Sequence, residues 1–549
     1  MIPRPYQRDA IESAMEHLAR GPSTRIVQAT GLGKTTQFCW IAERFVARGR
    51  VLIVADREEL LDQARDELYA VTGIRADLER AKHVASDGMF KSPVVLTSIQ
   101  TQRSGSNGDR RWHKFDPFEF SLIIIDEADL ACADSYREMM AHYRQNPSLK
   151  VLGVTATPNR HDGKTLNGMF GSVAHDFRIF DGVKEGWIVR PKQKYLDVEL
   201  NLDGAGYSLG DFKGKELREI LAAGDTIERI ASGAIQWAED RKSIVFCDSV
   251  ENAGRMAEAF NRSALGSAYI VTGKTPKDER PGIIDRFRAS GFQWLVNVGV
   301  CTRGFNVPDV RCIVLARPTL SATLHVQMIG RGTRTLPGVL DGIDDADVAG
   351  RRAAIAASAK PSLLVLDVVG NCAKHSLATT ADALGGTYSD AVVALADKMI
   401  RESAVPVDVL DAIEQAQDLH NAEIQRRAKE RGALRLHAKP SARDIDPFAF
   451  YGIEQSRDDF DNGEPMQDWQ REKIEGWKLK HVSNLTARDA DRIIAEYRRR
   501  GRNDLLTIKQ EAVLRRYGYD ASNMPYERAH AIMDALARNG WKPLKGARA

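Results

Sequence analysis

Two stretches of this sequence carry residue types that together could bind and hydrolyse a nucleotide. The first is Gln28–Thr35, QATGLGKT, which keeps the Gly-Lys-Thr end of a phosphate-binding loop but has Gln28 in place of the first glycine. In such a loop, backbone N–H groups surround phosphate oxygens, and the next helix directs its positive end at the same charge. We expect Lys34 to reach the β- and γ-phosphates of ATP and the Thr35 hydroxyl to bind Mg²⁺. The residues assigned to nucleotide binding are Thr30, Gly31, Leu32, Gly33, Lys34 and Thr35.

The second stretch is Ser121–Asp129, SLIIIDEAD, in which two carboxylates follow an apolar run. Ligands bind at the carboxyl ends of strands in parallel sheets, which is where Asp126 and Glu127 would lie. Asp126 is suited to holding Mg²⁺, and Glu127 is suited to orienting and deprotonating the attacking water. The alternative is a solvated acidic turn, which the phosphate-binding loop earlier in the chain makes the weaker interpretation.

These residues require strands to position them, and short apolar runs supply candidates. The runs are mostly unalternating and bounded by polar residues or glycine, as in strands buried on both faces of a parallel sheet. We expect two consecutive α/β units. The predicted strands are Arg25–Ala29, Val51–Ala55, Val94–Thr97, Leu122–Ile125 and Val151–Val154, then Ser243–Phe246, Tyr269–Val271, Trp294–Val298, Cys312–Leu315 and Leu363–Leu366.

The strand pattern ends near residue 377, and the rest of the chain is expected to be helical. Residues 336–361 form an Ala/Asp-rich insertion, expected to be a surface helix or loop. Residues 389–437 are expected to form helices interrupted at Pro406, and residues 438–467 have the composition of a linker. The predicted fold is two tandem RecA-like parallel-sheet domains followed by a small all-α region. The predicted boundaries are 1–190 for the ATP-binding domain, 191–376 for the second RecA-like domain, 377–467 for a helical extension and linker, and 468–549 for a helical repeat module.

With three further segments, these motifs resemble those of superfamily 2 helicases in their usual order. Thr155–Pro158, TATP, resembles motif III, while Val300–Asp309 resembles motif V and Gln327–Arg334, QMIGRGTR, matches motif VI. The start, Arg4–Gln7, resembles the segment that recognises adenine. The resemblance implies that Gln7 bonds the adenine edge, that Tyr6 helps to wall the base, and that Gly304 and Asp309 also contact nucleotide. It further implies catalytic roles for Gln327, Arg331 and Arg334, the arginines acting from the second domain when the cleft closes, and a coupling role for Thr155, Ala156 and Thr157.

By the same resemblance, nucleic-acid contacts fall on strand ends along the two sheets. Hydroxyls, amides and backbone N–H groups there would hold phosphates without reading sequence. An ordinary turn role is the alternative for each Ser or Thr. The predicted contacts are Arg57, Thr97, Gln100, Ser249, Thr272 and Thr302.

The motif variants favour DNA over RNA as the partner. DEAD-box RNA helicases share the Asp-Glu-Ala-Asp sequence, but their motif III begins with Ser and their motif VI with His-Arg, where this chain has Thr155 and Gln327-Met328. The motifs are more similar to those of RadD-type repair helicases and restriction-enzyme translocase subunits. The chain lacks the cysteine-rich zinc region of the RadD type, so partners cannot be carried over. An RNA helicase and an ATP-switched nucleic-acid clamp remain alternatives.

The last 82 residues contain an internal repeat and the positive excess of the chain. Ser483–Gly501 aligns without gaps against Ser522–Gly540. Residues 468–549 hold 18 Lys and Arg against 11 Asp and Glu, a charge of +7, whereas the whole chain is only +3. We expect two related helical units that contact nucleic acid or a protein partner. Trp477 and Tyr517 could stack on bases, but the pattern favours them as core residues.

Composition limits the remaining possibilities. The six cysteines are scattered without a C-x-x-C pair, so we expect neither a disulfide framework nor zinc, and a reducing cytoplasm fits. No apolar run is long enough for a spanning helix, so a membrane partner is not expected.

Overall fold

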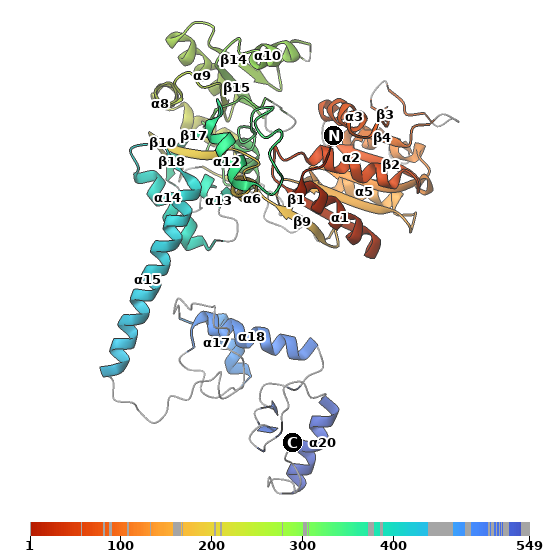
Figure 1. Ribbon diagram of the computed structural model, residues 1–549, viewed down its shortest axis with the longest axis vertical. Helices are drawn as coiled ribbons and strands as arrows, with labels where there is room; N and C mark the ends of the chain where they lie inside the picture. Colours follow the sequence, from red (N-terminus) through yellow and green to blue (C-terminus); the bar gives the residue numbers. More distant parts are fainter. Residues whose placement is uncertain are drawn as a thin grey trace. The chain divides into compact units, whose positions relative to one another are not determined.

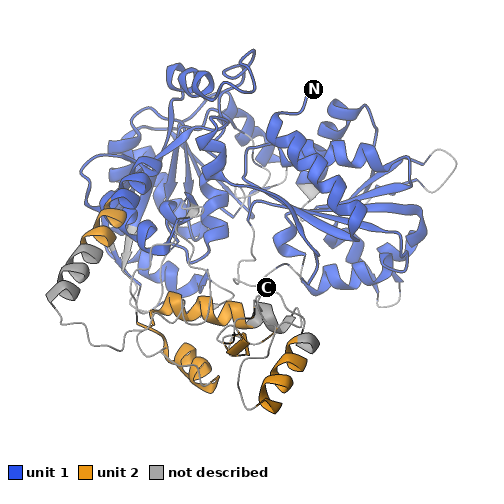
Figure 2. Cartoon of the chain, turned by 60° about the horizontal axis from the view of Figure 1, so that its bottom comes forward, with its two compact units in different colours: residues 1–418 blue, residues 419–549 orange. Residues whose placement is uncertain are grey.

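The computed structural model describes most of the chain. It excludes residues 1, 56–57, 81–82, 87–90, 107–108, 132, 158–165, 167, 203–204, 209–210, 277, 300–304, 306, 372–377, 385–387, 438–464, 478–484, 503–505, 507–509, 512, 515–516, 518, 520–525 and 540–549. The chain divides into a compact unit of residues 1–418 and a second unit of residues 419–549 (Figure 2).

The first sheet of unit 1 is entirely parallel, in the order β3-β4-β2-β7-β8-β1-β9. Figure 1 labels β3, β4 and β2 toward one edge of this sheet and β1 and β9 toward the other. Its strands are β1 (Ser23–Gln28), β2 (Arg50–Ala55), β3 (Asp77–Glu79), β4 (Val94–Ser98), β7 (Phe120–Asp126), β8 (Lys150–Thr155) and β9 (Val173–Phe177). A small hairpin joins β5 (Gly105–Ser106) and β6 (Asp109–Arg110). The helices of this domain are α1 (Pro5–Arg20), α2 (Lys34–Phe45), α3 (Glu58–Thr72), α4 (Ile99–Arg103), α5 (Asp134–Tyr143) and α6 (Ile179–Lys184).

The second sheet has the order β14-β15-β13-β16-β17-β10-β18 and is parallel except at its β10–β18 edge. Its strands are β10 (Arg190–Asn201), β13 (Ser243–Phe246), β14 (Ala268–Thr272), β15 (Trp294–Val298), β16 (Cys312–Leu315), β17 (Ser362–Asn371) and β18 (Val407–Asp408). The hairpin β11 (Tyr207–Ser208) and β12 (Asp211–Phe212) stands apart from it. The helices are α7 (Gly214–Ala222), α8 (Thr226–Ala238), α9 (Val250–Ser263), α10 (Glu279–Arg288), α11 (Ala322–Ile329), α12 (Val348–Ala357), α13 (Thr380–Leu384), α14 (Asp390–Glu402) and α15 (Val409–His437).

Both sheets are buried on their two faces, which explains why their strands are apolar without alternation. In β2, Val51 and Ile53 contribute to the core under α1, α2 and α3, whereas Leu52 and Val54 contribute to the opposite core against α5. In β13, Val245 faces the core that includes α8 and α9, and Ile244 faces the core that includes α10, α11 and α12. The predicted fold class of two parallel-sheet domains with helices is confirmed.

All ten predicted strands are present with small shifts at their ends, and the predicted helices on either side of Pro406 are α14 and α15. The insertion contains α12. The long strand β10 was not predicted, because its sequence RPKQKYLDVELN is too polar to resemble a buried strand. It lies next to the edge of the second sheet, between β17 and the short strand β18.

The second unit builds two small cores from matching positions of the repeat. The helix α18 (Ala487–Arg502) packs Ala490 and Ile493 against α17 (Asp468–Gly476), and Trp477 stacks on Tyr497 at 3.9 Å between ring centroids. In α20 (Tyr526–Arg538), the corresponding Ala529 and Ile532 contribute to the second core. Trp477 and Tyr517 both pack against these cores, in agreement with the interpretation that they are core residues. The predicted linker lies mostly outside the described residues.

No helix within the described residues is both long and apolar enough to cross a membrane.

The strand β8 leaves no space for a side chain at Gly153. A Cβ there would lie 2.5 Å from Cζ of the buried Phe170 and 3.0 Å from Cβ of Ala128. We expect Gly153→Ala to lower the free energy of unfolding by about 1–3 kcal/mol through overpacking. The matched control is Gly254→Ala in α9, where a Cβ meets nothing within 4 Å and a helix-propensity gain of up to about 1 kcal/mol is expected. Urea unfolding in which Gly153→Ala is as stable as the wild type would contradict this account of the packing.

Candidate functional site

The phosphate-binding loop connects β1 to α2 and depends on two glycines. Gly31 has φ +93° and Gly33 has φ +80°, a left-handed conformation in which other residues are strained. A Cβ on Gly33 would lie 2.6 Å from Nε2 of Gln7. The first helical residue after this turn is Lys34. The loop therefore presents its N–H groups and the positive end of α2 to one side of the first domain.

The carbonyl group of Leu32 fixes the loop on its buried side. The oxygen of Leu32 accepts hydrogen bonds from Gln28 Nε2 at 2.7 Å, Tyr6 Oη at 3.1 Å and Gln7 Nε2 at 3.2 Å. Gln28 is oriented in turn by Gln37, whose Nε2 donates to Gln28 Oε1 at 2.6 Å. The departure from the usual pattern at Gln28 thus has a physical role, because its amide braces the loop.

This arrangement places Tyr6 and Gln7 behind the loop, and their predicted contacts with adenine stay predictions. Its ring is 3% exposed and stacks on Phe177 at 4.9 Å, in the core beneath the loop. Gln7 is also buried and directs its amide nitrogen to the loop backbone, while its Oε1 accepts from the N–H of Arg4 at 2.9 Å. Leu32 lies in the same core. In this structure Tyr6, Gln7 and Leu32 support the loop from behind.

The two carboxylates follow β7 at the same edge of the sheet. Glu127 has φ +50°, an unusual conformation for a residue with a side chain, and such strained residues cluster at functional sites. Its N–H donates to Asp126 Oδ1 at 3.0 Å, which orients the Asp126 carboxylate. Both residues line a cleft together with the phosphate-binding loop.

Motif VI reaches this cleft from the second domain. A Cβ on Gly330 would lie 2.6 Å from Cβ of Thr30, and a Cβ on Gly31 would lie 3.0 Å from Cγ of Arg334. At both places the backbone of a glycine in one domain lies directly against a side chain of the other domain. The guanidinium groups of Arg331 and Arg334 both donate to the carbonyl oxygen of Phe305, at 3.1 and 3.3 Å. Burial, together with Arg331, lowers the pKa of Arg334 to about 10, so it remains charged at neutral pH.

The cleft has a volume of about 560 Å³ and mixes cationic and acidic groups from both domains. Its lining includes the predicted Thr30, Gly31, Gly33, Lys34, Thr35, Asp126, Glu127, Arg331 and Arg334, and also Arg4, Thr36, Leu60, Gln63, Ala64, Glu67, Pro308 and Pro337. Sequence reasoning had not assigned Arg4 or Glu67 to the site. Arg4 is the first residue of the adenine-type segment Arg4–Gln7, so the sequence held a signal for it. Glu67 on α3 is found through the structure, where its carboxylate accepts from the Thr36 hydroxyl at 2.5 Å.

The residues present fit ATP and magnesium. Loop N–H groups, Lys34 and the two arginines suit a triphosphate, and the Thr35 hydroxyl and Asp126 carboxylate are oxygen ligands of the kind that Mg²⁺ prefers.

Two other predicted nucleotide residues lie elsewhere. Asp309 forms an ion pair with the buried Lys242, at a separate pocket near the amino ends of the second sheet's strands. Its carboxylate is paired there and is not part of the lining of the cleft, so its assignment to ATP stays a prediction. Gln327 is 2% exposed on α11, and the lining of the cleft does not include it. Gly304 lies outside the described residues.

The predicted coupling segment links the carboxylate motif to the second domain. Thr155 Oγ1 donates to Asp129 Oδ1 at 3.4 Å and accepts from the N–H of Thr157 at 3.2 Å. The Thr157 and Thr323 hydroxyls lie 3.3 Å apart, and Thr323 is on α11 of the second domain. Ala156 is buried between the two threonines.

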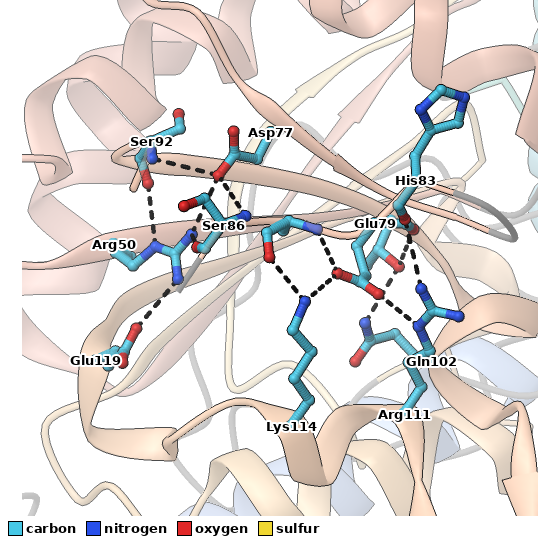
Figure 3. Close-up of polar contacts among 12 residues, drawn as sticks. Arg50, Asp77, Glu79, His83, Ser86, Ser92, Gln102, Arg111, Lys114 and Glu119 are labelled. Atoms are coloured by element: carbon cyan, nitrogen blue, oxygen red, sulfur yellow. Dashed lines mark hydrogen bonds and ion pairs between the residues drawn. The ribbon is translucent and has the colours of Figure 1, made fainter. Parts of the chain in front are cut away.

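Among the predicted nucleic-acid contacts of the first domain, Gln100 is exposed and Thr97 is not. The fully buried Thr97 hydroxyl donates to the carbonyl of Glu79 at 3.0 Å and accepts from Gln102 Nε2 at 3.1 Å. Glu79 anchors this region, because its buried carboxylate binds Arg111 and Lys114 (Figure 3). The Thr97 hydroxyl thus binds Gln102 of α4, the helix that carries Gln100, and its contact with nucleic acid stays a prediction.

In the second domain, the predicted contacts also serve the protein's own loops. Ser249 caps α9 by accepting from the N–H of Asn252 at 3.2 Å, and Thr272 Oγ1 accepts from the N–H of Lys274 at 3.1 Å. Both residues are buried, and the expectation that their hydroxyls hold phosphates stays a prediction. Arg57 and Thr302 lie outside the described residues.

Comparison with known families matches each domain separately. Residues 1–160 match the family described as type III restriction enzyme, res subunit, and residues 224–335 match the helicase conserved C-terminal domain. These two segments contain the phosphate-binding loop, the carboxylates and both arginines of the cleft. These two segments are therefore similar to the two motor domains of superfamily 2 helicases.

Individual superfamily 2 relatives cover the motor region. IRC3 of Saccharomyces cerevisiae, named as an ATP-dependent helicase, is 28% identical over 347 residues, which are 60% of this chain and 49% of IRC3. The DNA 3'-5' translocase XPB2 of Sulfurisphaera tokodaii is 27% identical over 60% of this chain and 75% of its own. The chain spans about half the length of the first relatives it matches. The solved structure of the ATP-dependent Type ISP restriction-modification enzyme LlaBIII bound to DNA shares the fold, with a TM-score of 0.50 and 15% identity over 99% of this chain and 40% of that one.

The brace at Gln28 can be tested by nucleotide binding. Gln28→Ala removes a donor to the Leu32 carbonyl and leaves the buried Gln37 amide without its acceptor. We expect a loss of about 1–2 kcal/mol, roughly 5- to 30-fold in ATP affinity, measured by titration with a fluorescent ATP analogue. Gln100→Ala, at an exposed position on α4, is the control and should bind ATP as the wild type does. Equal affinity of Gln28→Ala and the wild type would mean that the loop does not need this brace.

Proposed function

We propose that this protein is an ATP-dependent DNA helicase or translocase, which hydrolyses ATP between its two RecA-like domains to move on or unwind DNA in repair, recombination or replication. The observation that carries the proposal is the composition of the cleft. Lys34, Asp126 and Glu127 of the first domain and Arg331 and Arg334 of the second line the same space. A triphosphate bound there would bridge the domains, so that its cleavage would change how they hold together.

The residues of the cleft divide the work of ATP binding. The loop N–H groups and the Lys34 ammonium hold the phosphates, while Thr35 and Asp126 would hold Mg²⁺. When bound, Mg²⁺ neutralises charge on the phosphate oxygens. Arg4 also lines the cleft, and its guanidinium lies over the Trp187 ring at 5.2 Å, which gives a positive charge a fixed place near the nucleotide.

Hydrolysis needs a base that accepts a proton from the attacking water and positive charge that stabilises the γ-phosphoryl oxygens. Glu127 accepts a proton from water as the water oxygen bonds to the γ-phosphorus, and the bond from that phosphorus to the bridging oxygen of ADP breaks. Negative charge on the γ-phosphoryl oxygens is stabilised by Arg331 and Arg334, which reach the cleft from the second domain. Their present acceptor, the Phe305 carbonyl, is a neutral group that a phosphate can replace.

DNA is the proposed track. The relatives named for DNA, such as the DNA 3'-5' translocase XPB2, support it, as do the motif III and VI variants that differ from those of DEAD-box RNA helicases. The exposed Gln100 on α4, held in place through Thr97 and Gln102, is the first-domain contact that the geometry favours. Contacts of this kind act on the phosphate backbone and do not read sequence.

The proposal is tested by ATP turnover with a nucleic-acid panel. The wild type should hydrolyse ATP faster with single-stranded or forked DNA than with RNA of the same sequence. Glu127→Gln should bind ATP normally but lose turnover, whereas Lys34→Ala should lose binding, because one group activates water and the other holds phosphate.

Each result bears on a different part of the proposal. Normal turnover of Glu127→Gln with DNA present would remove Glu127 from the role of base. Stimulation by RNA alone would replace the DNA assignment with an RNA helicase. Stimulation by DNA without displacement of a strand or movement along a long substrate would indicate an ATP-switched clamp.

The tail module, residues 468–549, is proposed as an accessory nucleic-acid or partner module. Its charge of +7 and its two helical units with their own cores support this role. Arg498, Arg499, Arg500 and Arg502 are clustered at the end of the first repeated helix, and the Trp477–Tyr497 stack belongs to a core. Phosphate contacts by charge are therefore favoured over base stacking.

Removal of the chain after about residue 440 tests this module. The truncated protein should keep basal ATPase activity but bind forked DNA more weakly, with a salt dependence that is shallower by a little under one log–log unit per lost phosphate contact. Fluorescence anisotropy over a salt series gives the slope. Unchanged affinity and slope would favour a protein partner for the module, and complete loss of basal ATPase activity would mean that the repeats support the motor.

A further inference from the structure

Lys360 is a fully buried lysine placed directly behind the arginines of the cleft. It lies between α12 and β17, and its side chain is 1% exposed. Its ammonium donates to the carbonyl oxygen of Pro308 at 2.6 Å and to the carbonyl oxygen of Arg334 at 2.7 Å. Burying an ammonium is unfavourable, so a lysine in this place calls for a role that an apolar side chain would not fill.

These two carbonyls belong to the segments that aim the arginines. Pro308 lines the cleft and follows Phe305, whose carbonyl accepts from both Arg331 and Arg334. Arg334 is held at its guanidinium end by Phe305 and at its backbone by Lys360. One ammonium therefore ties motif V to motif VI on the side away from the nucleotide.

We infer that Lys360 is a positioning residue for ATP hydrolysis, which sets the two guanidinium groups toward the γ-phosphate by fixing the backbone at Pro308 and Arg334. The inference rests on the proposed function, because it acts only through Arg331 and Arg334. Lys360 itself is proposed to contact neither the phosphates of ATP nor the attacking water. Its loss should thus affect turnover and leave the binding of ATP to the loop of the first domain unchanged.

The charged groups around Lys360 make it responsive to pH. Burial, with smaller contributions from Arg334 and Arg311, lowers its pKa to about 7, and Asp309, itself paired with Lys242, opposes this shift. The unfolded lysine has a pKa near 10.4, so between about pH 7 and pH 10 the unfolded chain binds more protons than the folded one. Stability of the wild type should accordingly gain from this residue as pH rises through that window.

The test compares Lys360→Met, Lys360→Gln and Lys242→Met in the full chain, with Arg334→Ala as reference. Lys360→Met should lower kcat by about tenfold to a hundredfold with KM for ATP nearly unchanged, since a misplaced catalytic group costs about this much. Lys360→Gln keeps one amide donor and should recover part of kcat. Lys242→Met removes a buried lysine that pairs with Asp309 and does not contact Arg334, so it should turn over as the wild type does.

A combined variant separates positioning from general support. Lys360→Met added to the Arg331→Ala/Arg334→Ala variant should be no slower than that variant alone, because Lys360 acts only through these two arginines. Multiplicative losses, or a rise in KM equal to the fall in kcat, would overturn the inference. Wild-type turnover of Arg334→Ala would instead refute the proposed role of the arginine, and the two failures are therefore distinct.

Discussion

The carbonyl of Leu32 is the point on which the cleft depends. A loop that turns its N–H groups toward phosphate must point a carbonyl the other way, and a buried carbonyl without donors would destabilise the turn. Here Tyr6, Gln7 and Gln28 all donate to it, while the Leu32 side chain enters a core shared with Trp187 and Ile413 of α15. The phosphate-binding loop is thus fixed from behind by polar and apolar contacts together.

This constraint determines what the rest of the cleft can be. The second domain approaches the fixed loop closely where motif VI has glycine, at Gly330 against Thr30. That approach brings Arg331 and Arg334 near each other, and their mutual repulsion is lessened by a shared carbonyl at Phe305. Arg331, Arg334 and Lys360 are therefore all bound to backbone carbonyl oxygens. The acidic side chains that line the cleft, Asp126, Glu127 and Glu67, all come from the first domain.

The sequence predicts the central strands well because burial on both faces imposes apolar runs, as in β2 and β7. It does not predict β10, whose polar residues near a sheet edge resemble a loop, nor the packing of α13 to α15 against Trp187. At the site, glycines and charged residues were predictable because phosphate chemistry restricts their types. The surroundings of Thr97 and Asp309 were not, because whether a hydroxyl or carboxylate faces the cleft or its own chain depends on partners distant in sequence, Glu79 and Lys242.

The contacts between the domains differ in strength in a way that suits repeated movement. The hydroxyl pathway from Asp129 through Thr155 and Thr157 to Thr323 contains bonds of 3.3 and 3.4 Å, near the upper limit for hydrogen bonds. Weak polar contacts of this kind can break and re-form with little change in free energy, whereas the apolar core beneath Leu32 cannot open without exposing several large side chains. A cycle of ATP hydrolysis would therefore alter the domain contact first at Thr157 and Thr323, with the core around Leu32 and Trp187 as the part that stays closed.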